Sequence, residues 1–300
     1  EAEASYRKAI ELKPNYAEAY NDLGSILHHQ TKLDKAKKYY KKSTELKPDF
    51  AKAHNNLGAI LQDLGKLDEA ETSYRKAIKL EPDYEDATLN LDILRRQKDL
   101  LVNIFRKRKS MKKDKIEGIN FSVGLTSNPF ITHRSVEKKF FKDLYKGKLK
   151  ELDKTHKIDA RFGNGKCSDF NLFKSDFSII KKIEKDLINI MKEAVKSDIC
   201  IFDSFLNIYK AGGGTAPHIH IGNFDKTQGL VNQKYSLTYY LSIGDQNCSE
   251  PGNLKVYNPD KEISLSKGMI VIIPASRKHS AVYNGEKDRV MIGVNFYSLI

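Results

Sequence analysis

The 300-residue sequence predicts an α+β multidomain chain, with an N-terminal all-α domain followed by a sheet-rich domain with flanking helices. Three observations lead to this prediction. A motif recurs every 34 residues near the N-terminus, an amphipathic segment spans 175–196, and eight short apolar runs follow Ser197, separated by Gly, Pro, Asn and Asp. The expected boundaries are a helical domain at 1–105, a basic linker at 106–118 and a sheet domain at 119–300.

The N-terminal motif reads KPNY at 13–16, KPDF at 47–50 and EPDY at 81–84. This 34-residue period, with two amphipathic helices in each unit, resembles the tetratricopeptide repeat. Small residues such as Gly24 and Ala36 let paired helices approach closely. The resemblance implies a solenoid whose concave groove binds a protein or peptide partner.

The third repeat departs from the pattern, because Asp92 replaces a small residue and Arg95 an apolar one. Residues 85–105 are therefore expected to form a capping helix that ends the solenoid. Three histidines lie within the repeats and are expected to have packing or surface roles rather than to bind metal: His28, His29 and His54.

The net charge of +13 is concentrated at one place in the sequence. Residues 95–115 contain ten Lys or Arg against two Asp, a local net of +8. This segment reads either as a contact for nucleic acid or an acidic partner, or as a helix end followed by a mobile hinge. The second reading is favoured, because no aromatic residues interleave the charges of the run RKRKSMKKDK at 106–115 as in a single-strand groove. The remaining +5 calls for no polyanionic partner, so nucleic acid binding is not expected.

Two further features bear on the setting of the chain. No run approaches the ~20 apolar residues of a membrane span, and the three cysteines are too scattered for a disulfide framework. We therefore expect a cytoplasmic protein without a membrane segment. The sequence opens inside the repeat pattern without a Met, which indicates a fragment of a longer chain.

The second half of the sequence changes from helices to strands. The amphipathic segment 175–196 predicts a helix with Ser175 or Asp176 as its N-cap, and a shorter helix is expected at 135–146. The expected strands are 200–209, 217–221, 235–243, 253–257, 262–265, 269–273, 279–283 and 288–298. Eight short strands preceded by helices fit a jelly roll, or double-stranded β-helix, with helices packed on one face.

Three histidines of this half form a candidate metal site. His218 and His220 are spaced i, i+2 in a predicted strand, so both side chains project from one face. His279 follows about sixty residues later, and a jelly roll brings such a distant strand back beside the earlier one. Two neighbouring ligands and one distant ligand are typical of the facial site of non-haem Fe(II) oxygenases. The alternative is a set of structural histidines. The two other histidines of this half, His133 and His156, are expected to have ordinary surface or helix roles.

An arginine in a predicted strand adds to this site. In RVMIGVNFYSL, alternation places Arg289, Met291 and Asn295 on one face. Arginine is costly to bury unless it is paired, and its guanidinium binds a carboxylate through two parallel hydrogen bonds. A dicarboxylate co-substrate such as 2-oxoglutarate would supply that carboxylate.

Residues 209–220, YKAGGGTAPHIH, resemble the YxxGxxYxxHxD segment of prolyl 4-hydroxylase-type 2-oxoglutarate/Fe(II) oxygenases. The similarity is greatest to the HxH-containing bacterial and phage branch, which is often fused to tetratricopeptide repeats and which ARFGNGKCSDFNLF at 160–173 also resembles. It covers most of 120–300. Further landmarks follow in the family's order: Tyr239-Tyr240-Leu241, Gly252-Asn253-Leu254, Gly268 to Pro274, His279 and Arg289.

The resemblance implies a role for each matching residue. His218 and His279 would be Fe(II) ligands, and Arg289 would hold the distal carboxylate of 2-oxoglutarate. Tyr209 and Tyr239 would hydrogen-bond the co-substrate, although packing is an equal alternative for Tyr239.

The chain departs from the family pattern at one ligand, because His220 replaces the usual carboxylate. A three-histidine site can still hold Fe(II), and Asp225 is the alternative third ligand. The polar insertion 222–234 is expected to be a substrate-covering loop, and the glycines 212–214 a tight β-turn.

The sequence thus predicts an Fe(II)- and 2-oxoglutarate-dependent dioxygenase, a hydroxylase, docked to its target by a repeat arm. One alternative is a non-catalytic interaction protein with a structural metal site, and another is a cupin-like three-histidine enzyme without 2-oxoglutarate. Arg289 separates these alternatives: exposure to solvent, or a side chain blocked by Phe296-like packing, would weigh against the oxygenase. The substrate stays open among protein side chains, peptides and small metabolites.

Overall fold

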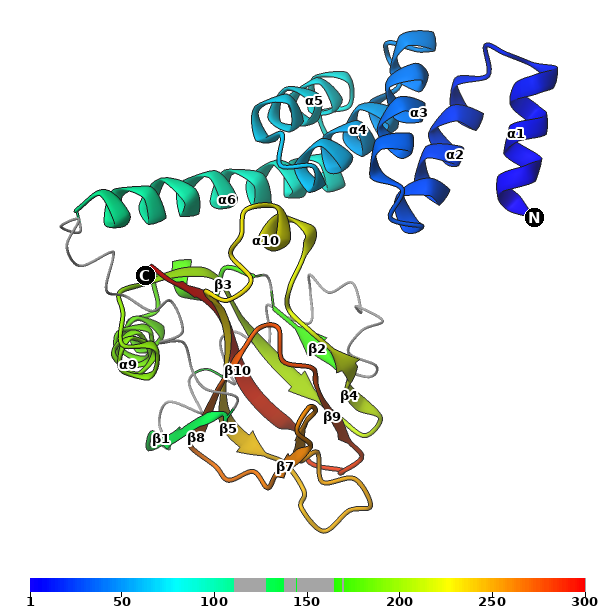
Figure 1. Ribbon diagram of the computed structural model, residues 1–300. Coiled ribbons are helices and arrows are strands. Elements are labelled where there is room, and N and C mark those ends of the chain that lie inside the picture. Colours follow the sequence, from blue (N-terminus) through cyan, green and yellow to red (C-terminus); the bar gives the residue numbers. More distant parts are fainter. Residues whose placement is uncertain (111–127, 138–143, 145–164, 169, 300) are drawn as a thin grey trace. The chain divides into compact units, whose positions relative to one another are not determined.

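The computed structural model describes residues 1–110, 128–137, 144, 165–168 and 170–299 (Figure 1). Helical repeats at the N-terminus are followed by a sheet-rich region (Figure 1). The described chain forms two compact units: Glu1–Val102 with Gly222–Gly229, and Asn103–Ile221 with Leu230–Ile300. Among the described helices, none is both long enough and apolar enough to cross a membrane.

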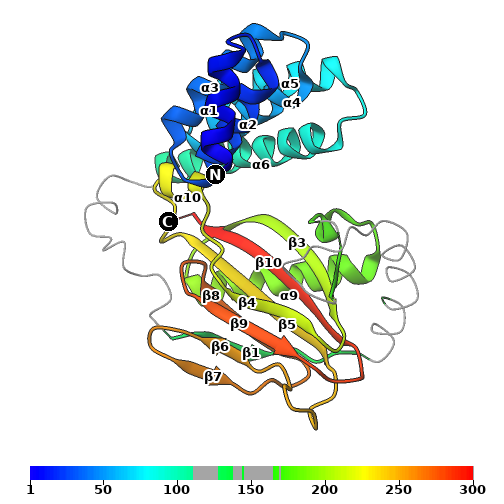
Figure 2. The same cartoon turned by 90° about the vertical axis from the view of Figure 1, so that its right-hand side faces the viewer.

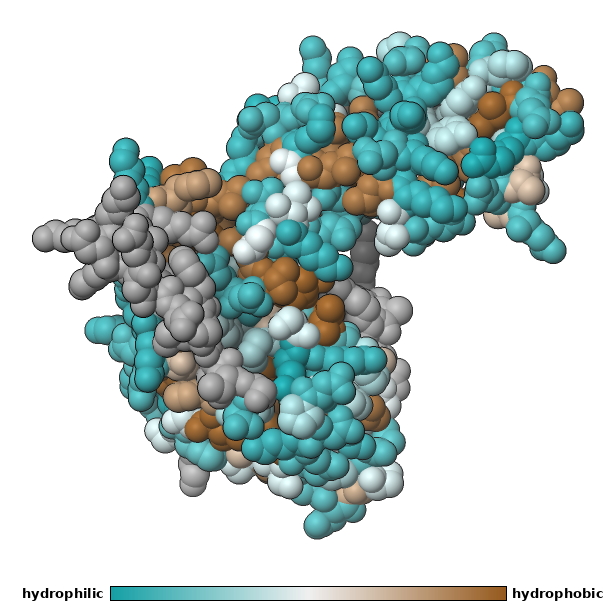
Figure 3. All heavy atoms as spheres, in the orientation of Figure 1, coloured by the Kyte–Doolittle hydropathy of each residue, from teal (hydrophilic) through white to brown (hydrophobic). Residues whose placement is uncertain are grey.

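The repeat helices follow the 34-residue period. Their bounds are α1 (Ala2–Leu12), α2 (Ala17–His29), α3 (Leu33–Leu46), α4 (Ala51–Asp63), α5 (Leu67–Leu80) and α6 (Glu85–Ser110). A Cβ placed on Gly24 would lie 2.8 Å from the ring of Tyr40, and one on Gly58 would lie 2.6 Å from Tyr74. Each glycine therefore gives a buried tyrosine room between two helices. Hydrophilic side chains dominate the visible surface of these helices, with apolar patches between them (Figure 3).

The helix α6 is longer than the capping helix expected at 85–105. It continues to Ser110, so the first residues of the basic segment are helical rather than a hinge. Lys and Arg are good helix formers, and their charges are favourable near a helix C-terminus. The rest of the expected linker, from residue 111, lies outside the described residues.

Two antiparallel sheets make up the second unit (Figure 2). The first has six strands in the order β1-β8-β5-β10-β3-β2. Its strands are β1 (Phe130–His133), β2 (Lys166–Cys167), β3 (Ile199–Tyr209), β5 (Lys234–Ile243), β8 (Met269–Pro274) and β10 (Arg289–Ser298). The second has the order β4-β9-β6-β7, with β4 (Gly213–His218), β6 (Leu254–Val256), β7 (Lys261–Ile263) and β9 (His279–Tyr283).

Each of the eight expected strands overlaps an observed one, but one is displaced. The strand expected at 217–221 begins at Gly213 and ends at His218. Two short strands, β1 and β2, were not expected. His133 is exposed at the end of β1, where its Nε2 contacts Ser266 Oγ at 2.9 Å, which agrees with the expected surface role. His156 and most of the helix expected at 135–146 lie outside the described residues.

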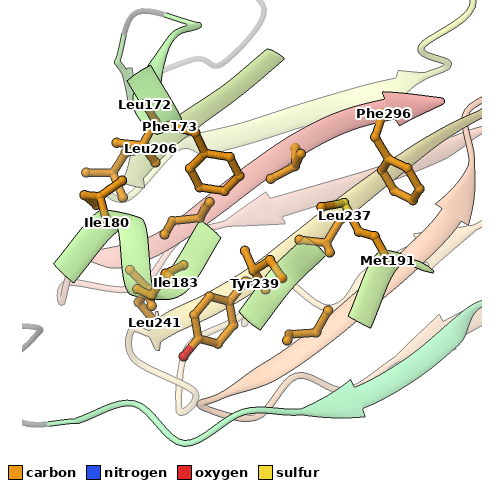
Figure 4. Packing of buried hydrophobic residues seen from close by; sticks show 14 of the residues in the cluster. Leu172, Phe173, Ile180, Ile183, Met191, Leu206, Leu237, Tyr239, Leu241 and Phe296 are labelled. Atoms are coloured by element: carbon orange, nitrogen blue, oxygen red, sulfur yellow. The ribbon is translucent and has the colours of Figure 1, made fainter. Parts of the chain in front are cut away.

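One face of the six-stranded sheet packs against α9 (Ser178–Val195), which forms where the amphipathic pattern predicts it. Figure 4 shows Ile183 and Met191 of this helix with Leu237, Tyr239 and Phe296 of the sheet. The helix begins later than expected. Its N-cap is Phe177, without a side-chain capping bond, and the 3-10 helix η2 (Leu172–Lys174) precedes it, so neither Ser175 nor Asp176 is the cap.

The other face of the six-stranded sheet packs against the four-stranded sheet. We call the space between the two sheets the inter-sheet core. The six-stranded sheet contributes Tyr209, Tyr240 and Met291 to it, among others. The four-stranded sheet contributes Leu254, Val256 and Tyr283. Strand residues alternate between the two faces of a sheet. Residues two positions before or after these on the same strand therefore also point into this space.

Candidate metal centre

His218, His220 and His279 form a group of potential metal ligands. One nitrogen from each ring lies within 4.8 Å of the others, and the Nε2 atoms of His220 and His279 are 3.2 Å apart. Nitrogen ligands bound to one metal ion at about 2.1 Å lie roughly 3 Å from one another. The donor set therefore suits a first-row metal ion, and the separation of His220 from His279 already matches such a site.

Strand pairing brings two of these histidines together. In the register of β4 and β9, His218 lies opposite His279, and Val256 of the inter-sheet core pairs with His279 from the other side. A register shift separates Thr215 from His218. Since Tyr283 points into the inter-sheet core, alternation along β9 directs His279 to the same space.

His220 reaches the group in a different way from the one expected. It lies two residues beyond the end of β4, so it does not share a strand face with His218. Its backbone N–H donates to the carbonyl of Ala275, 2.8 Å away, just after β8. This bond fixes the segment after β4, and the ring centroids of His218 and His220 are 4.9 Å apart.

Backbone carbonyls select the tautomer of two of these histidines. The Nδ1 of His218 lies 2.9 Å from the carbonyl of Ala216, and the Nδ1 of His279 lies 3.0 Å from that of Arg277. A carbonyl only accepts hydrogen bonds, so each Nδ1 carries the proton and each Nε2 keeps a lone pair. Burial lowers the pKa of His279 to about 4, which keeps this ring neutral near pH 7.

Two of the three glycines at 212–214 belong to β4. Gly213 and Gly214 are strand residues, and the expected turn is limited to the residues before them. Gly214 has a φ of +139°, and a Cβ there would collide with the carbonyl oxygen of Ala281. A glycine at this position therefore lets β4 approach β9 closely enough to pair the two histidines.

Among the described residues, the group of potential metal ligands does not include Asp225. It belongs to the short helix α10 (Asn223–Thr227), where its Oδ2 accepts a hydrogen bond from the N–H of Gly222 at 2.8 Å. Its side chain is buried. The insertion expected to be a loop therefore contains a capped helical turn, and Asp225 caps it.

Arg289 is buried in the inter-sheet core, with an exposed fraction of 1%. Phe296 lies on the opposite face of the sheet and does not block it. The guanidinium donates to the carbonyls of Gly252 (2.5 Å) and Pro251, and it lies over the ring of Tyr283. A Cβ on Gly252 would collide with this guanidinium. Among the described residues no carboxylate pairs with Arg289, and burial lowers its pKa.

Two tyrosines expected to bind a co-substrate lie on different faces. Tyr209 pairs with Arg289 across β3 and β10, and it lies in the inter-sheet core. Tyr239 lies in the core that packs against α9 (Figure 4). Its hydroxyl accepts a hydrogen bond from Nη1 of Arg134 at 3.2 Å. Its neighbour Tyr240 faces the inter-sheet core instead, and burial raises its pKa to about 12.

The sequence reasoning missed three residues around Arg289: Asn207, Tyr240 and Tyr283. A signal for Tyr240 existed. Leu237, Tyr239 and Leu241 share one face of β5, and their apolar row marks the side covered by the helix. Tyr240, one residue out of step, therefore faces away from that helix.

Comparison with known proteins supports the repeats. Models of the tetratricopeptide repeat match residues 51–84 and 17–50, and a TPR repeat model matches 1–31. No curated protein matches the chain.

Two solved structures are similar to part of the chain. The first TPR domain of Spaghetti (RPAP3), bound to an HSP90 peptide, is 25% identical over 31% of this chain and 73% of its own, with a TM-score of 0.30. The Arabidopsis OM64 TPR domain is 24% identical over 30% and 74%, also at 0.30. The family matches confirm the prediction for the N-terminal helices: they are tetratricopeptide repeats.

Proposed function

We propose that this chain is an Fe(II)- and 2-oxoglutarate-dependent dioxygenase, acting as a hydroxylase, with a repeat arm that binds a protein or peptide partner. The observation that carries the proposal is a pair of features on the inter-sheet core. One is the three-histidine group, and the other is a buried guanidinium on the opposing sheet without a carboxylate partner among the described residues.

The three histidines suit ferrous iron held by neutral imidazoles. His218, His220 and His279 would hold the ion, and three protein ligands would leave room for a co-substrate to bind it. Iron bound there with a 2-oxo acid supplies the oxidising power to insert one oxygen atom of O₂ into a C–H bond, with succinate and carbon dioxide as co-products. The carbonyls of Ala216 and Arg277 would hold two of the rings in their metal-binding tautomer.

Arg289 would bind and orient the co-substrate. An unpaired cation is costly to bury, and the backbone carbonyls around it compensate its charge only in part. A carboxylate would complete the pairing through two parallel hydrogen bonds. Tyr209 lies opposite Arg289 and would place a hydroxyl beside the bound carboxylate.

The arrangement of the strands also supports this proposal. The two packed antiparallel sheets, with the order β8-β5-β10-β3 at the centre of one and β4-β9-β6-β7 in the other, are compatible with a double-stranded β-helix. Such a fold would place the metal ligands on the smaller sheet and the co-substrate arginine on the larger one. The apolar residues between the sheets would exclude water from the reacting groups.

The second candidate function is a repeat-based interaction protein with a structural metal site. One observation favours it: Arg289 already contacts the carbonyls of Pro251 and Gly252, so it could serve to hold the 244–253 segment. On this alternative the three histidines would bind an ion such as Zn²⁺, and no 2-oxo acid would bind.

The test is anaerobic addition of Fe(II) and then 2-oxoglutarate, followed by the metal-to-ligand charge-transfer absorbance. We expect a band in the parent chain, no band in His279→Ala, and in Arg289→Ala a band that needs at least about tenfold more 2-oxoglutarate, because a charge-assisted pair is lost. His133→Ala is the matched control, since this histidine is exposed on β1. A parent chain that binds metal but gives no band would refute the oxygenase and favour the structural site.

A further inference from the structure

Asn207 is a buried polar residue that the proposed mechanism does not yet use. It lies on β3, two residues before Tyr209, and its exposed fraction is 3%. Among the described residues its Oδ1 has no hydrogen-bond partner. A buried acceptor without a partner is destabilising, so such a group points to a ligand or a water that would satisfy it.

The register of β3 and β10 places Asn207 beside the buried arginine. Asn207 lies opposite Met291, and Tyr209 lies opposite Arg289. Alternation puts Asn207 and Tyr209 on the same inner face, about 7 Å apart along the strand. The Nδ2 of Asn207 donates to the hydroxyl of Tyr209 at 3.3 Å. The three polar side chains therefore form one continuous group within an otherwise largely apolar core.

The carboxamide can satisfy itself by turning over. Its oxygen and nitrogen ends are nearly equal in size, so rotation by about 180° exchanges them at little steric cost. Burial raises the pKa of Tyr209, so its hydroxyl keeps a proton and can donate to the Asn207 oxygen. The Nδ2 then lies where the unpaired oxygen was, and it presents a donor that an anion would accept.

We propose that Asn207 belongs to the carboxylate-binding site around Arg289, and that its amide donates to the distal carboxylate of the co-substrate. This inference rests on the proposed function and specifies its substrate class: a 2-oxo dicarboxylic acid is preferred over a 2-oxo monocarboxylic acid of the same length. Arg289 supplies the charge and the Asn207 amide an uncharged donor. The single proton of the Tyr209 hydroxyl goes to the Asn207 oxygen and holds that amide in place.

The experiment compares two ligands that differ only at the distal end. The full chain is loaded anaerobically with Fe(II) and titrated with 2-oxoglutarate or with 2-oxopentanoate, which lacks the second carboxylate. Both ligands report through the same charge-transfer band of the 2-oxo acid end. We expect Asn207→Leu to weaken 2-oxoglutarate binding by about tenfold and to leave 2-oxopentanoate within about twofold, because one hydrogen bond to a charged group is lost. Asn207→Asp should weaken 2-oxoglutarate further, because it places a second negative charge beside the carboxylate.

Asn295→Leu is the matched control. This amide is also buried, and its Oδ1 also has no partner among the described residues, but it lies six residues from Arg289 on β10, about 20 Å along the strand. Its ratio of the two dissociation constants should equal that of the parent. If Asn207→Leu lowered the affinity for both ligands equally, or for neither, the role of Asn207 would be overturned while the oxygenase proposal stands. A parent chain that gives no band with either ligand would overturn both.

Discussion

At the scale of single residues, the glycines of the repeats carry a steric constraint that reverses the usual propensity. Replacing glycine by alanine inside a helix normally stabilises it by about 1 kcal/mol. At Gly58 the added Cβ would lie 2.6 Å from the Tyr74 ring, closer than carbon atoms approach. We expect Gly58→Ala to lower the free energy of unfolding of the repeats by about 1–3 kcal/mol, the usual cost of overpacking.

Urea unfolding followed by far-UV circular dichroism would measure this change. Lys38→Ala is the control, because Lys38 is exposed on α3 and its replacement should have an effect within about 0.5 kcal/mol. If Gly58→Ala proved as stable as the parent, the Tyr74 ring would be able to move aside. The close contact would then not determine the helix spacing.

Tyr209 and Tyr239 lie on opposite faces of the six-stranded sheet, so we expect them to have different roles. Tyr209→Phe removes a hydroxyl beside Arg289, so we expect it to weaken 2-oxoglutarate binding by about fivefold, in keeping with one lost hydrogen bond. Tyr239→Phe removes a hydroxyl that contacts Arg134 on the other face, so co-substrate binding should be unchanged. Titration of the charge-transfer band measures both variants, and an equal effect would show that the face does not matter.

Individual site residues differ in how far the sequence could predict them. The approach of His279 to His218 follows from the return of a distant strand beside an earlier one. Strand periodicity misplaced His220, which lies beyond the end of β4. The choice between Tyr239 and Tyr240 depends on which face of β5 the helix covers, and that is a tertiary property. Asn207 has no motif at all, because its significance comes from the register between β3 and β10.

At the scale of elements, asparagine pairs join successive repeats. The Nδ2 of Asn56 donates to the Oδ1 of Asn21 at 2.9 Å, which links α4 to α2. The Nδ2 of Asn90 donates to the Oδ1 of Asn55 at 3.0 Å, which links α6 to α4. Each bond joins two residues that are 35 positions apart in the sequence, so it couples neighbouring 34-residue units directly.

A double-mutant cycle on Asn21→Ala and Asn56→Ala tests this coupling. We expect an interaction free energy of about 0.5–1.5 kcal/mol, the net value of one hydrogen bond, in urea unfolding of the repeats. The control cycle pairs Asn21→Ala with Lys38→Ala, which do not share a bond and should be additive within about 0.5 kcal/mol. Additive effects for the asparagine pair would mean that apolar contacts alone couple the repeats.

The observed bounds of the helices and strands show where a sequence pattern misplaces the start or end of an element. Periodicity predicts α9, because one face of this helix lies on a core. The central strands β5, β8 and β10 have both faces on a core, so they are predicted by apolar runs between turn residues. The displaced start of β4 was not predictable from alternation, since Gly213 and Gly214 carry no side-chain pattern and pair with β9 through their backbones. The extension of α6 to Ser110 reflects helix propensity beyond the last packed residues.

At the scale of the whole molecule, two compact units with separate cores should unfold as separate transitions. The candidate metal and co-substrate groups lie in the sheet-rich unit, whereas the repeats carry none of them. A ligand that binds only the folded sheet unit stabilises it by about 2.7 kcal/mol at a hundredfold excess over its dissociation constant. The repeat unit should gain nothing from that ligand.

Differential scanning calorimetry of the full chain should therefore resolve two transitions, and anaerobic Fe(II) with 2-oxoglutarate should raise the temperature of one of them only. His279→Ala should abolish this shift while leaving the other transition in place, and Gly58→Ala should lower the other transition alone. The two substitutions thus assign each transition to its unit. A single transition that moves with ligand would mean that the repeats and the sheets unfold cooperatively, so that a partner bound to the repeats could change the stability of the metal site.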